Sequence, residues 1–232
     1  MADDTTPRPL ILAFDTARSH VAAALGAGTT VLSSIYEEMA RGQAERLPDA
    51  VEEMLEATGL EWSQIGLVAA GVGPGNFTGI RISVAYARGL SLGLDRPAVG
   101  VSAFDLSRDA ASPMRELVSV EGPRGQAYVQ AFAAGSVAGP PEVIDPAAPP
   151  ARLAHDGLQI TGWRAEQIAG ALGCRAAPRA PDALAADLPR RLLSAAHKNS
   201  TGATAAAPVP LYVRPADAAP SREPPPRIFD DA

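Results

Sequence analysis

The chain has 232 residues, of which 47% are hydrophobic, so it can bury the core of one large domain or two small ones. Its formal net charge of −6 disfavours unaided binding to nucleic-acid phosphates, which needs clustered Lys and Arg, so RNA contact is expected only through a partner. A single cysteine, Cys174, excludes a disulfide framework and fits a reducing cytoplasm. The acidic N-terminus lacks the features of a secretory signal, and no run reaches the ~18 apolar residues of a membrane span. We therefore expect a cytoplasmic protein that does not enter a membrane.

Three strands are predicted at the start of the chain. The apolar run Leu10 to Phe14 is followed by Val21 to Leu25 and, after a Gly-Ala-Gly turn, by the β-branched stretch Thr30 to Tyr36. Short connections between them predict an antiparallel meander. Asp15 follows the first run, so its carboxylate should lie at the carboxyl end of a buried strand.

An amphipathic helix is predicted next, over Gln43 to Ala57. Its apolar residues recur at steps of three and four, while glutamates occupy the opposite side. Pro48 falls inside this stretch, and an interior proline removes a hydrogen bond and crowds the preceding turn. We therefore expect the helix to begin near Leu47 or to kink.

A glycine-rich loop connects the next strand and helix. The strand Gly66 to Val72 leads into Gly71-Val72-Gly73-Pro74-Gly75-Asn76-Phe77-Thr78-Gly79, and a helix should then reach about Leu92 before a strand at Ala98 to Val101. The second half predicts further strands and helices in alternation. These are a helix from Ala103 to about Ala111, strands at Leu117 to Val120, Ala127 to Ala133 and Leu158 to Thr161, and helices at Arg164 to Leu172 and Asp187 to His197.

The pattern divides the chain into three parts. Residues 1–101 are expected to form an N-terminal lobe and residues 102–207 a C-terminal lobe. Residues 208–232 are rich in proline and alanine, which predicts a disordered or loosely attached tail.

The glycine loop and the first strand's end are candidates for binding a nucleotide phosphate. Unpaired backbone N–H groups and the helix dipole favour an anion at such a strand-to-helix junction. The candidate residues are Asp15, Thr16, Gly73, Gly75 and Thr78. The alternative is purely structural: the glycines shape a tight turn, Thr78 or Asn76 caps the helix, and Asp15 caps its own turn. The turn after Asp15 has no glycine that would let the backbone wrap around phosphates. The sequence therefore supports the two interpretations of Asp15 equally.

No catalytic residue or metal ligand is predicted. The three histidines, His20, His155 and His197, are far apart and form no ligand pair on one helical face. Cys174 has no neighbouring histidine in sequence and no serine-hydrolase motif is present. We expect no cofactor.

Small residues recur every four positions on the helix after the glycine loop, and a stripe of this kind lets another backbone approach closely. A partner interface is therefore predicted from this helix and from the apolar side of the preceding one; its residues are Leu47, Val51, Gly79, Ile80, Ser83, Val84, Ala87 and Ser91. The alternative, that the stripe packs this helix against its own sheet, stays open.

Several motifs together resemble the bacterial TsaB family. They are Ile11-Leu12-Ala13-Phe14-Asp15-Thr16, Gln43 with Arg46-Leu47-Pro48, Gly73-Pro74-Gly75-Asn76-Phe77-Thr78-Gly79-Ile80-Arg81-Ile82 and Gly100-Val101-Ser102, with fainter likenesses at Gly125 to Tyr128, Thr161 to Trp163 and Pro210 to Arg214. The resemblance spans nearly the whole chain and is specific over its first hundred residues.

The resemblance implies an α/β fold of two actin-like, sugar-kinase-like (RNase H-like) lobes with mixed sheets flanked by helices. TsaB proteins are partners of TsaD, the transferase that makes threonylcarbamoyladenosine on tRNA, and of the ATPase TsaE. The paired-histidine metal site of TsaD has no counterpart in the helix that begins at Gln43. Two departures from the family are Gly42 in place of a common histidine and Glu121-Gly122-Pro123-Arg124 in place of an Asp-Ala-Arg-like stretch.

The sequence thus favours a non-catalytic scaffold subunit that binds TsaD and TsaE, or a second copy of itself when TsaD is absent. One alternative is an active nucleotide-dependent transferase or kinase of the same fold, supported by Asp15-Thr16 and the glycine loop. A metallopeptidase is a remote alternative, because ligand pairs are lacking.

Overall fold

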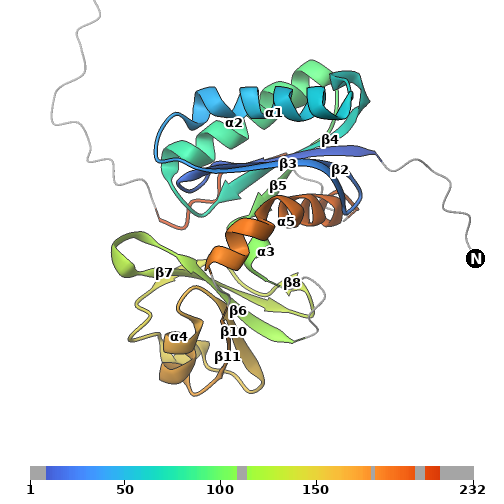
Figure 1. The fold of residues 1–232 in the computed structure, drawn as a ribbon. Coiled ribbons are helices and arrows are strands. Elements are labelled where there is room, and N and C mark those ends of the chain that lie inside the picture. Colours follow the sequence, from blue (N-terminus) through green and yellow to red (C-terminus); the bar gives the residue numbers. More distant parts are fainter. Residues whose placement is uncertain (1–8, 109–113, 179–180, 202–206, 215–232) are drawn as a thin grey trace, which may run out of the picture.

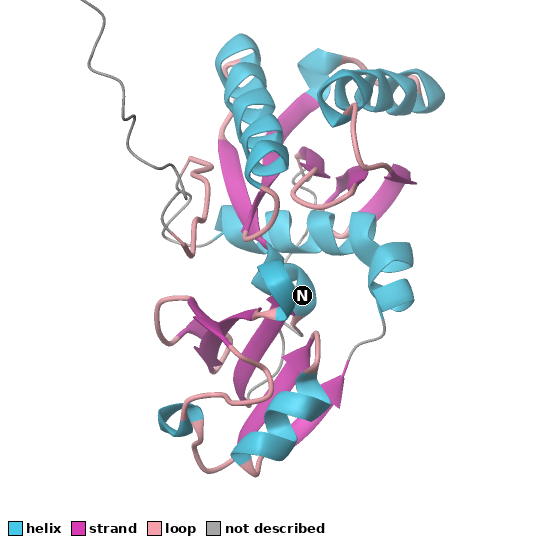
Figure 2. Cartoon of the chain, turned by 90° about the vertical axis from the view of Figure 1, so that its left-hand side faces the viewer, coloured by secondary structure: helices cyan, strands magenta, loops and turns pink. Residues whose placement is uncertain are grey.

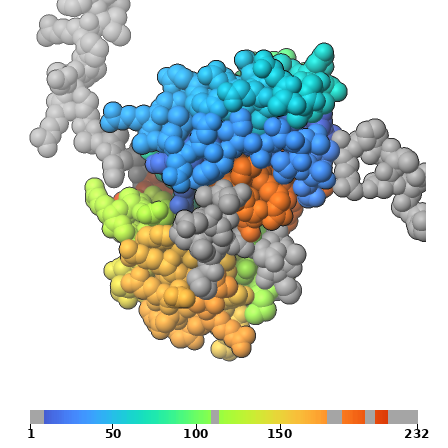
Figure 3. Space-filling view, in the orientation of Figure 1, coloured from blue at the N-terminus to red at the C-terminus, as the bar shows by residue number. Residues whose placement is uncertain are grey.

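The computed structural model describes residues 9–108, 114–178, 181–201 and 207–214. Two β-sheets are stacked with helices above, between and below them (Figure 1). The helices α1 and α2 cover the outer face of the upper sheet, and α4 lies on the outer side of the lower one. Figure 2 shows α5 lying between the two sheets, and the space-filling view separates the same two lobes (Figure 3).

The first sheet has five strands in the order β3-β2-β1-β4-β5. The strands are β1 (Leu10–Asp15), β2 (His20–Ala27), β3 (Thr30–Glu38), β4 (Ile65–Gly73) and β5 (Ala98–Ser102). The first three pair antiparallel, which confirms the predicted meander, while β4 and β5 run parallel to β1. Strands β1 and β4 are buried almost throughout, as expected for strands with helices on both faces.

Helices α1 (Gln43–Thr58) and α2 (Phe77–Leu94) lie on one face of this sheet. Leu47, Val51 and Met54 of α1 point into a core that they share with β1, β2 and β4. The helix begins at Gln43 and includes Pro48, so the expected start near Leu47 is wrong. Packing of the apolar side against the sheet offsets the hydrogen bond that Pro48 cannot donate.

Helix α5 (Pro181–Thr201) covers the opposite face of the first sheet. Leu188, Leu192 and Ala196 are buried against Ile11, Ala13 and their neighbours. The chain therefore returns to the first lobe after completing the second. The expected C-terminal lobe over residues 102–207 differs from the structure in this respect, because the helix that should belong to it packs on the N-terminal sheet.

The second sheet repeats the strand pattern of the first. Its order is β11-β10-β6-β7-β8, with β9 also pairing with β7. The elements are α3 (Ala103–Ser107), β6 (Arg115–Glu121), β7 (Ala127–Ala133), β8 (Ser136–Val137), β9 (Glu142–Ile144), β10 (Leu158–Gly162), α4 (Ala165–Leu172) and β11 (Arg175–Pro178). Short 3-10 turns lie at Trp62–Gln64, Pro123–Gly125 and Ala151–Leu153. The helix expected from Ala103 to Ala111 ends at Ser107, and its last three expected residues lie outside the described part.

The segment 207–214 crosses between the lobes as an ordered strap. Its backbone is anchored to the first lobe where the Leu211 N–H donates to the Val72 carbonyl at 2.8 Å. The Leu211 side chain packs against clusters of both lobes. The tail predicted from residue 208 is thus docked as far as Arg214, because Leu211 and Val213 do find apolar surface to bury; residues 215–232 lie outside the described part.

Candidate functional site

The carboxylate of Asp15 lies at the carboxyl end of β1, as predicted, but it is engaged within its own turn. One of its oxygens, Oδ1, accepts hydrogen bonds from the Ala17 N–H at 2.9 Å and from His20 Nε2 at 2.8 Å. Asp15 is only 4% exposed and His20 only 7%. The bond to Ala17 is the Asx turn of the structural alternative. No sequence pattern indicated that His20 would be a partner of Asp15.

Thr16 is fully buried and attached to helix α2. Its Oγ1 donates to the Gly79 carbonyl at 2.7 Å, and its backbone N–H donates to Ser83 Oγ at 3.0 Å. The two hydroxyl groups are also 2.7 Å apart. Each polar group of Thr16 that could hold a phosphate therefore serves to fix α2 against the end of β1.

The amino end of α2 is closed in the same way. Asn76 Oδ1 accepts from the backbone N–H of Thr78 at 2.9 Å and of Gly79 at 3.3 Å. These are the donors that an anion at a helix N-terminus would use. The Asn76 N–H itself donates to the Ala17 carbonyl at 2.6 Å. Of the two helix caps that the structural interpretation offered, Thr78 and Asn76, the structure has Asn76.

The glycines of the loop allow close approach between chain segments. A Cβ on Gly75 would lie 2.2 Å from the Ala17 carbonyl oxygen, and one on Gly79 would lie 1.9 Å from that of Thr16. Gly73 is buried at the end of β4 and joined to Pro74 by a cis peptide bond. The glycine loop is pressed against the turn after β1, which fills the place where a phosphate would approach the backbone.

A cleft of about 600 Å³ opens in front of this junction, between the lobes. Its walls come from both sheets: Ala17, Arg18, Ser19, His20, Tyr36, Glu38, Gly75, Asn76, Glu121, Gly122, Pro123 and Tyr128. Of the five residues predicted to bind a nucleotide, only Gly75 lines it. Arg18 and Glu121 form an ion pair across it with 3.7 Å between Nη1 and Oε2. These two residues were not predicted to act together, because each comes from a different lobe.

The stripe of small residues on α2 faces inward. Ile80, Ser83, Val84 and Ala87 are at most 5% exposed, and Gly79 is also buried. On α1, Leu47 and Val51 are fully buried. Ser91 is half-exposed, and its Oγ donates to the Arg96 carbonyl at 2.6 Å. Apart from Ser91, these side chains pack the helices onto their own sheet, so the prediction that they contact a partner is wrong and the alternative of packing within the chain is correct.

The outer side of α2 carries exposed apolar groups instead. Leu92 is 86% exposed, and Phe77 is 42% exposed at the other end of the helix. Phe77 stacks on Tyr212 of the strap with 5.2 Å between ring centroids, and the Arg81 guanidinium lies 3.8 Å from the Phe77 ring centroid. Arg81 Nε also donates to the Tyr212 hydroxyl. Rigid aromatic and arginine side chains of this kind are typical of binding surfaces.

The outer side of α1 is acidic. Its exposed residues include Glu45, Asp49, Glu52, Glu53 and Glu56. Arg46 contributes the positive charge of this side by bonding both Glu53 and Glu37 of β3. The hydrogen bonds from Arg46 lower the pKa of Glu37 and of Glu53, and the pKa of Arg46 itself is raised chiefly by its bond to Glu37.

The described residues contain no group of three or more His, Cys, Asp or Glu that could hold a metal ion. Cys174 is half-buried, with its Sγ near the Leu172 carbonyl. None of the described helices is long and apolar enough to cross a membrane.

A comparison with protein families identifies this architecture. The family model described as "TsaD: tRNA N6-adenosine threonylcarbamoyltransferase" matches residues 30–151, which is more than half of the chain. The chain belongs to the TsaD family. The matched region includes α1, the glycine loop and α2, together with the start of the second sheet.

Some curated relatives carry the name TsaB, the family that the sequence motifs resemble. The chain is 34% identical over 122 residues to the tRNA threonylcarbamoyladenosine biosynthesis protein TsaB of Escherichia coli, an alignment that covers 51% of this chain and 52% of the relative. The chain thus spans about half the length of this curated relative. A relative named TsaB from Haemophilus influenzae is 33% identical over 86 residues, with 37% of this chain and 36% of the relative covered.

Solved structures extend the likeness to the whole fold. YeaZ from Pseudomonas aeruginosa is 26% identical with a TM-score of 0.67, covering 88% of this chain and 99% of that one. The ethanolamine utilization protein EutJ from Carboxydothermus hydrogenoformans, 11% identical with a TM-score of 0.52, covers 83% of this chain and 92% of its own. The expected α/β fold class of two actin-like lobes with mixed sheets is confirmed.

Proposed function

We propose that this chain is a non-catalytic accessory subunit in the synthesis of threonylcarbamoyladenosine on tRNA, in which it binds TsaD and TsaE and supports the transferase activity of TsaD. Membership of the TsaD family and likeness to proteins named TsaB support the pathway. With a net charge of −6, the chain reaches tRNA only through the complex.

The polar groups at the end of β1 already form hydrogen bonds within the chain, and this supports the proposal that the chain is not catalytic. Asp15, Thr16 and the amino end of α2 are the features that would hold a metal–phosphate group in a related nucleotide enzyme. Each already has a partner within the chain, and a phosphate would have to break those bonds to enter.

The outer faces of α1 and α2 are the surface we propose for TsaD, or for a second copy of this chain when TsaD is absent. Leu92, Phe77 and Arg81 supply apolar and aromatic contacts on α2, beside the acidic side of α1. A surface of this composition is suited to a partner with an apolar helix face and basic residues along its edge.

Replacing Leu92 with aspartate tests the proposed surface. We expect Leu92→Asp to weaken binding to purified TsaD by at least about tenfold, because it places a charge where an apolar side chain should be buried. Folding should be unaffected, since Leu92 is 86% exposed. Val137→Asp is the matched control, because Val137 is 61% exposed but belongs to the second lobe.

Omission of the chain from a synthesis rebuilt with purified components tests the function itself. We expect threonylcarbamoyladenosine formation to stop without it and to return on adding it back. Undiminished formation would contradict the accessory role. Equal TsaD affinity for Leu92→Asp and Val137→Asp would leave that role standing but move the contact elsewhere.

The interlobe cleft of about 600 Å³ supports a second candidate, a nucleotide-dependent transferase or kinase. Calorimetry with ATP and magnesium separates the two functions. Micromolar binding with turnover by the isolated chain would favour the enzyme, whereas the accessory role predicts no turnover.

A further inference from the structure

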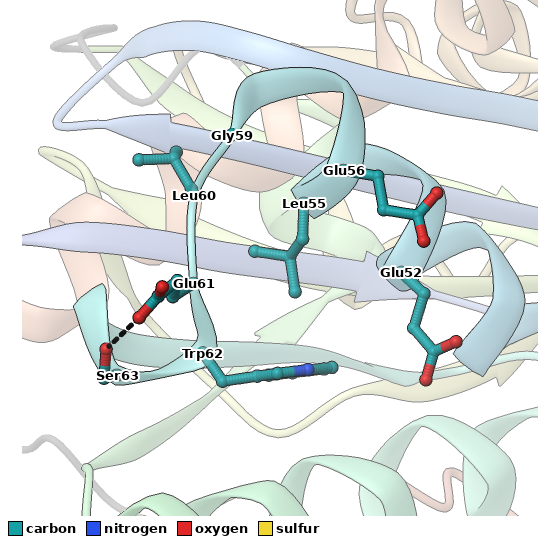
Figure 4. Close-up of a pocket in the computed structure, with 8 residues that line it drawn as sticks. All are labelled: Glu52, Leu55, Glu56, Gly59, Leu60, Glu61, Trp62 and Ser63. Carbon is teal, nitrogen blue, oxygen red and sulfur yellow. Dashed lines mark hydrogen bonds between the residues drawn. The ribbon is translucent and has the colours of Figure 1, made fainter.

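A groove lies at the carboxyl end of α1, away from the interlobe cleft. Its volume is about 620 Å³, and the residues that line it are Glu52, Leu55, Glu56, Gly59, Leu60, Glu61, Trp62 and Ser63 (Figure 4). They come from the last turns of α1, from the connection Gly59 to Glu61 and from the 3-10 turn that follows, so a single continuous segment builds the groove.

The floor of the groove is apolar. Leu55 points toward the indole ring of Trp62, and the ring extends beneath it in the direction of Glu52 (Figure 4). Trp62 and Leu60 are half-buried and pack at the edge of the core of the first lobe. The ring is thus held in place while part of it stays open to a ligand.

The rim of the groove is negatively charged. Glu52, Glu56 and Glu61 are exposed, and the described residues supply no ion pair to any of the three. The negative end of the α1 dipole lies at the same place, and the last turn of α1 contains no basic residue. Carboxylates and helix dipole therefore act together, and a cation placed here would be attracted by both.

Other aromatic rings of the chain already carry an arginine. Arg81 lies 3.8 Å from the Phe77 ring centroid, Arg108 lies 4.3 Å from that of Phe132, and Arg164 lies 4.4 Å from that of Trp163. Within the described residues, the Trp62 ring has no such cation. Trp62 nevertheless lies on the same groove as the carboxylates of Glu52 and Glu56, which would attract a cation placed over the ring.

We propose that this groove binds an arginine side chain presented by a partner protein. The planar guanidinium stacks on the Trp62 ring while its N–H groups reach the carboxylates of Glu52 and Glu56. Arginine fits better than lysine, because an ammonium group can neither stack flat on the indole nor bond two carboxylate oxygens in parallel. The proposal does not depend on the tRNA-modification role and can fail without affecting it.

The two tryptophans allow a direct test, because Trp62 and Trp163 are the only two in the chain. Their indole N–H resonances are followed by NMR while the full chain is titrated with the peptide acetyl-Ala-Arg-Ala-amide. We expect the Trp62 signal to shift with saturation and the Trp163 signal to stay in place, since Arg164 already occupies that ring. A matched citrulline peptide keeps the shape without the charge and should leave both signals unmoved.

Charge removal at the rim supplies the matched variants. Glu52→Gln with Glu56→Gln should weaken binding of the arginine peptide at least fivefold. Glu45→Gln with Asp49→Asn removes the same net charge from the exposed side of the same helix, near its other end, and should change binding less than twofold. If both pairs of substitutions weakened peptide binding equally, the effect would come from the overall charge of the helix. That result would overturn the proposed site.

Other occupants give distinct results. Equal affinity for a lysine peptide would overturn the assignment to arginine. The chain also has arginines of its own at Arg222 and Arg227. A shift of the Trp62 signal on Arg222→Gln with Arg227→Gln, without any peptide, would assign the groove to the chain itself and overturn the partner proposal.

Discussion

The two faces of α2 differ in how far the rest of the chain covers them and bonds to them. On the inner face, Gly79 and Ser83 meet Thr16 at hydrogen-bonding distance, and Ala87 is fully buried. On the outer face, Leu92 is 86% exposed, and a Cβ on Gly89 would meet nothing within 4 Å. The small residues therefore fit this chain to itself, whereas the large exposed ones remain available to the partner that we propose.

Substitution of Ser83 by arginine should give the largest effect. Ser83 is fully buried, so an arginine there would place an unpaired charge in the core and leave the Thr16 N–H without an acceptor. We expect a loss of about 4 kcal/mol or more in the free energy of unfolding, measured by urea denaturation.

Ala85→Arg is the control for this substitution, because Ala85 is exposed on the same helix. It should change stability by less than about 0.5 kcal/mol. A folded Ser83→Arg protein as stable as Ala85→Arg would contradict the inward orientation of the stripe.

Substitutions of two glycines in α2 should change the stability by smaller amounts and in opposite directions. Gly79→Ala should destabilise the fold by about 1–3 kcal/mol, because the new Cβ would lie 1.9 Å from the Thr16 carbonyl oxygen and force the helix away from β1. Gly89→Ala should instead stabilise it by about 0.5–1 kcal/mol, since alanine favours a helix interior and meets open space here. Calorimetric melting of both variants measures the difference, and a stabilised Gly79→Ala protein would be incompatible with the close contact.

Tyr86 lies on the flank of α2 nearest α1 and should give the smallest effect. Burial, and to a lesser extent the charge of Glu52, raises the pKa of Tyr86 to about 12. Between about pH 10 and 12, the folded protein therefore keeps the Tyr86 proton, whereas the unfolded chain, with a tyrosine pKa of about 10, has lost it. Stability from this group is present below pH 10 and falls as the pH rises from about 10 to 12.

Ultraviolet titration checks the Tyr86 pKa. Glu52→Gln should lower it only slightly, because burial is the larger cause. If Tyr86 titrated near pH 10 in the folded protein, its ring would be exposed to solvent. That result would contradict its burial beside α1.

Local patterns predicted much of the fold. The two apolar runs and the β-branched stretch between Leu10 and Tyr36, with short connections, predicted the meander, and steps of three and four predicted α1. The sequence left two interpretations of Asp15 open, a phosphate site and the cap of its own turn. A carboxylate at a strand end has the same sequence signature whether it binds a ligand or, as here, Ala17 and His20.

The sequence by itself determined most of the strands and helices, though not the short strands β8, β9 and β11, and through its motifs it indicated the likeness to TsaB proteins. Only the tertiary structure decided that the stripe of α2 faces inward, that α5 returns to the first sheet and that the strap joins both lobes through Leu211. The physical reason is that helix and strand periods depend on neighbours a few residues apart. The partner of a buried face is instead chosen by shape and hydrogen bonding between residues such as Thr16 and Ser83, which are distant along the chain and leave no periodic pattern.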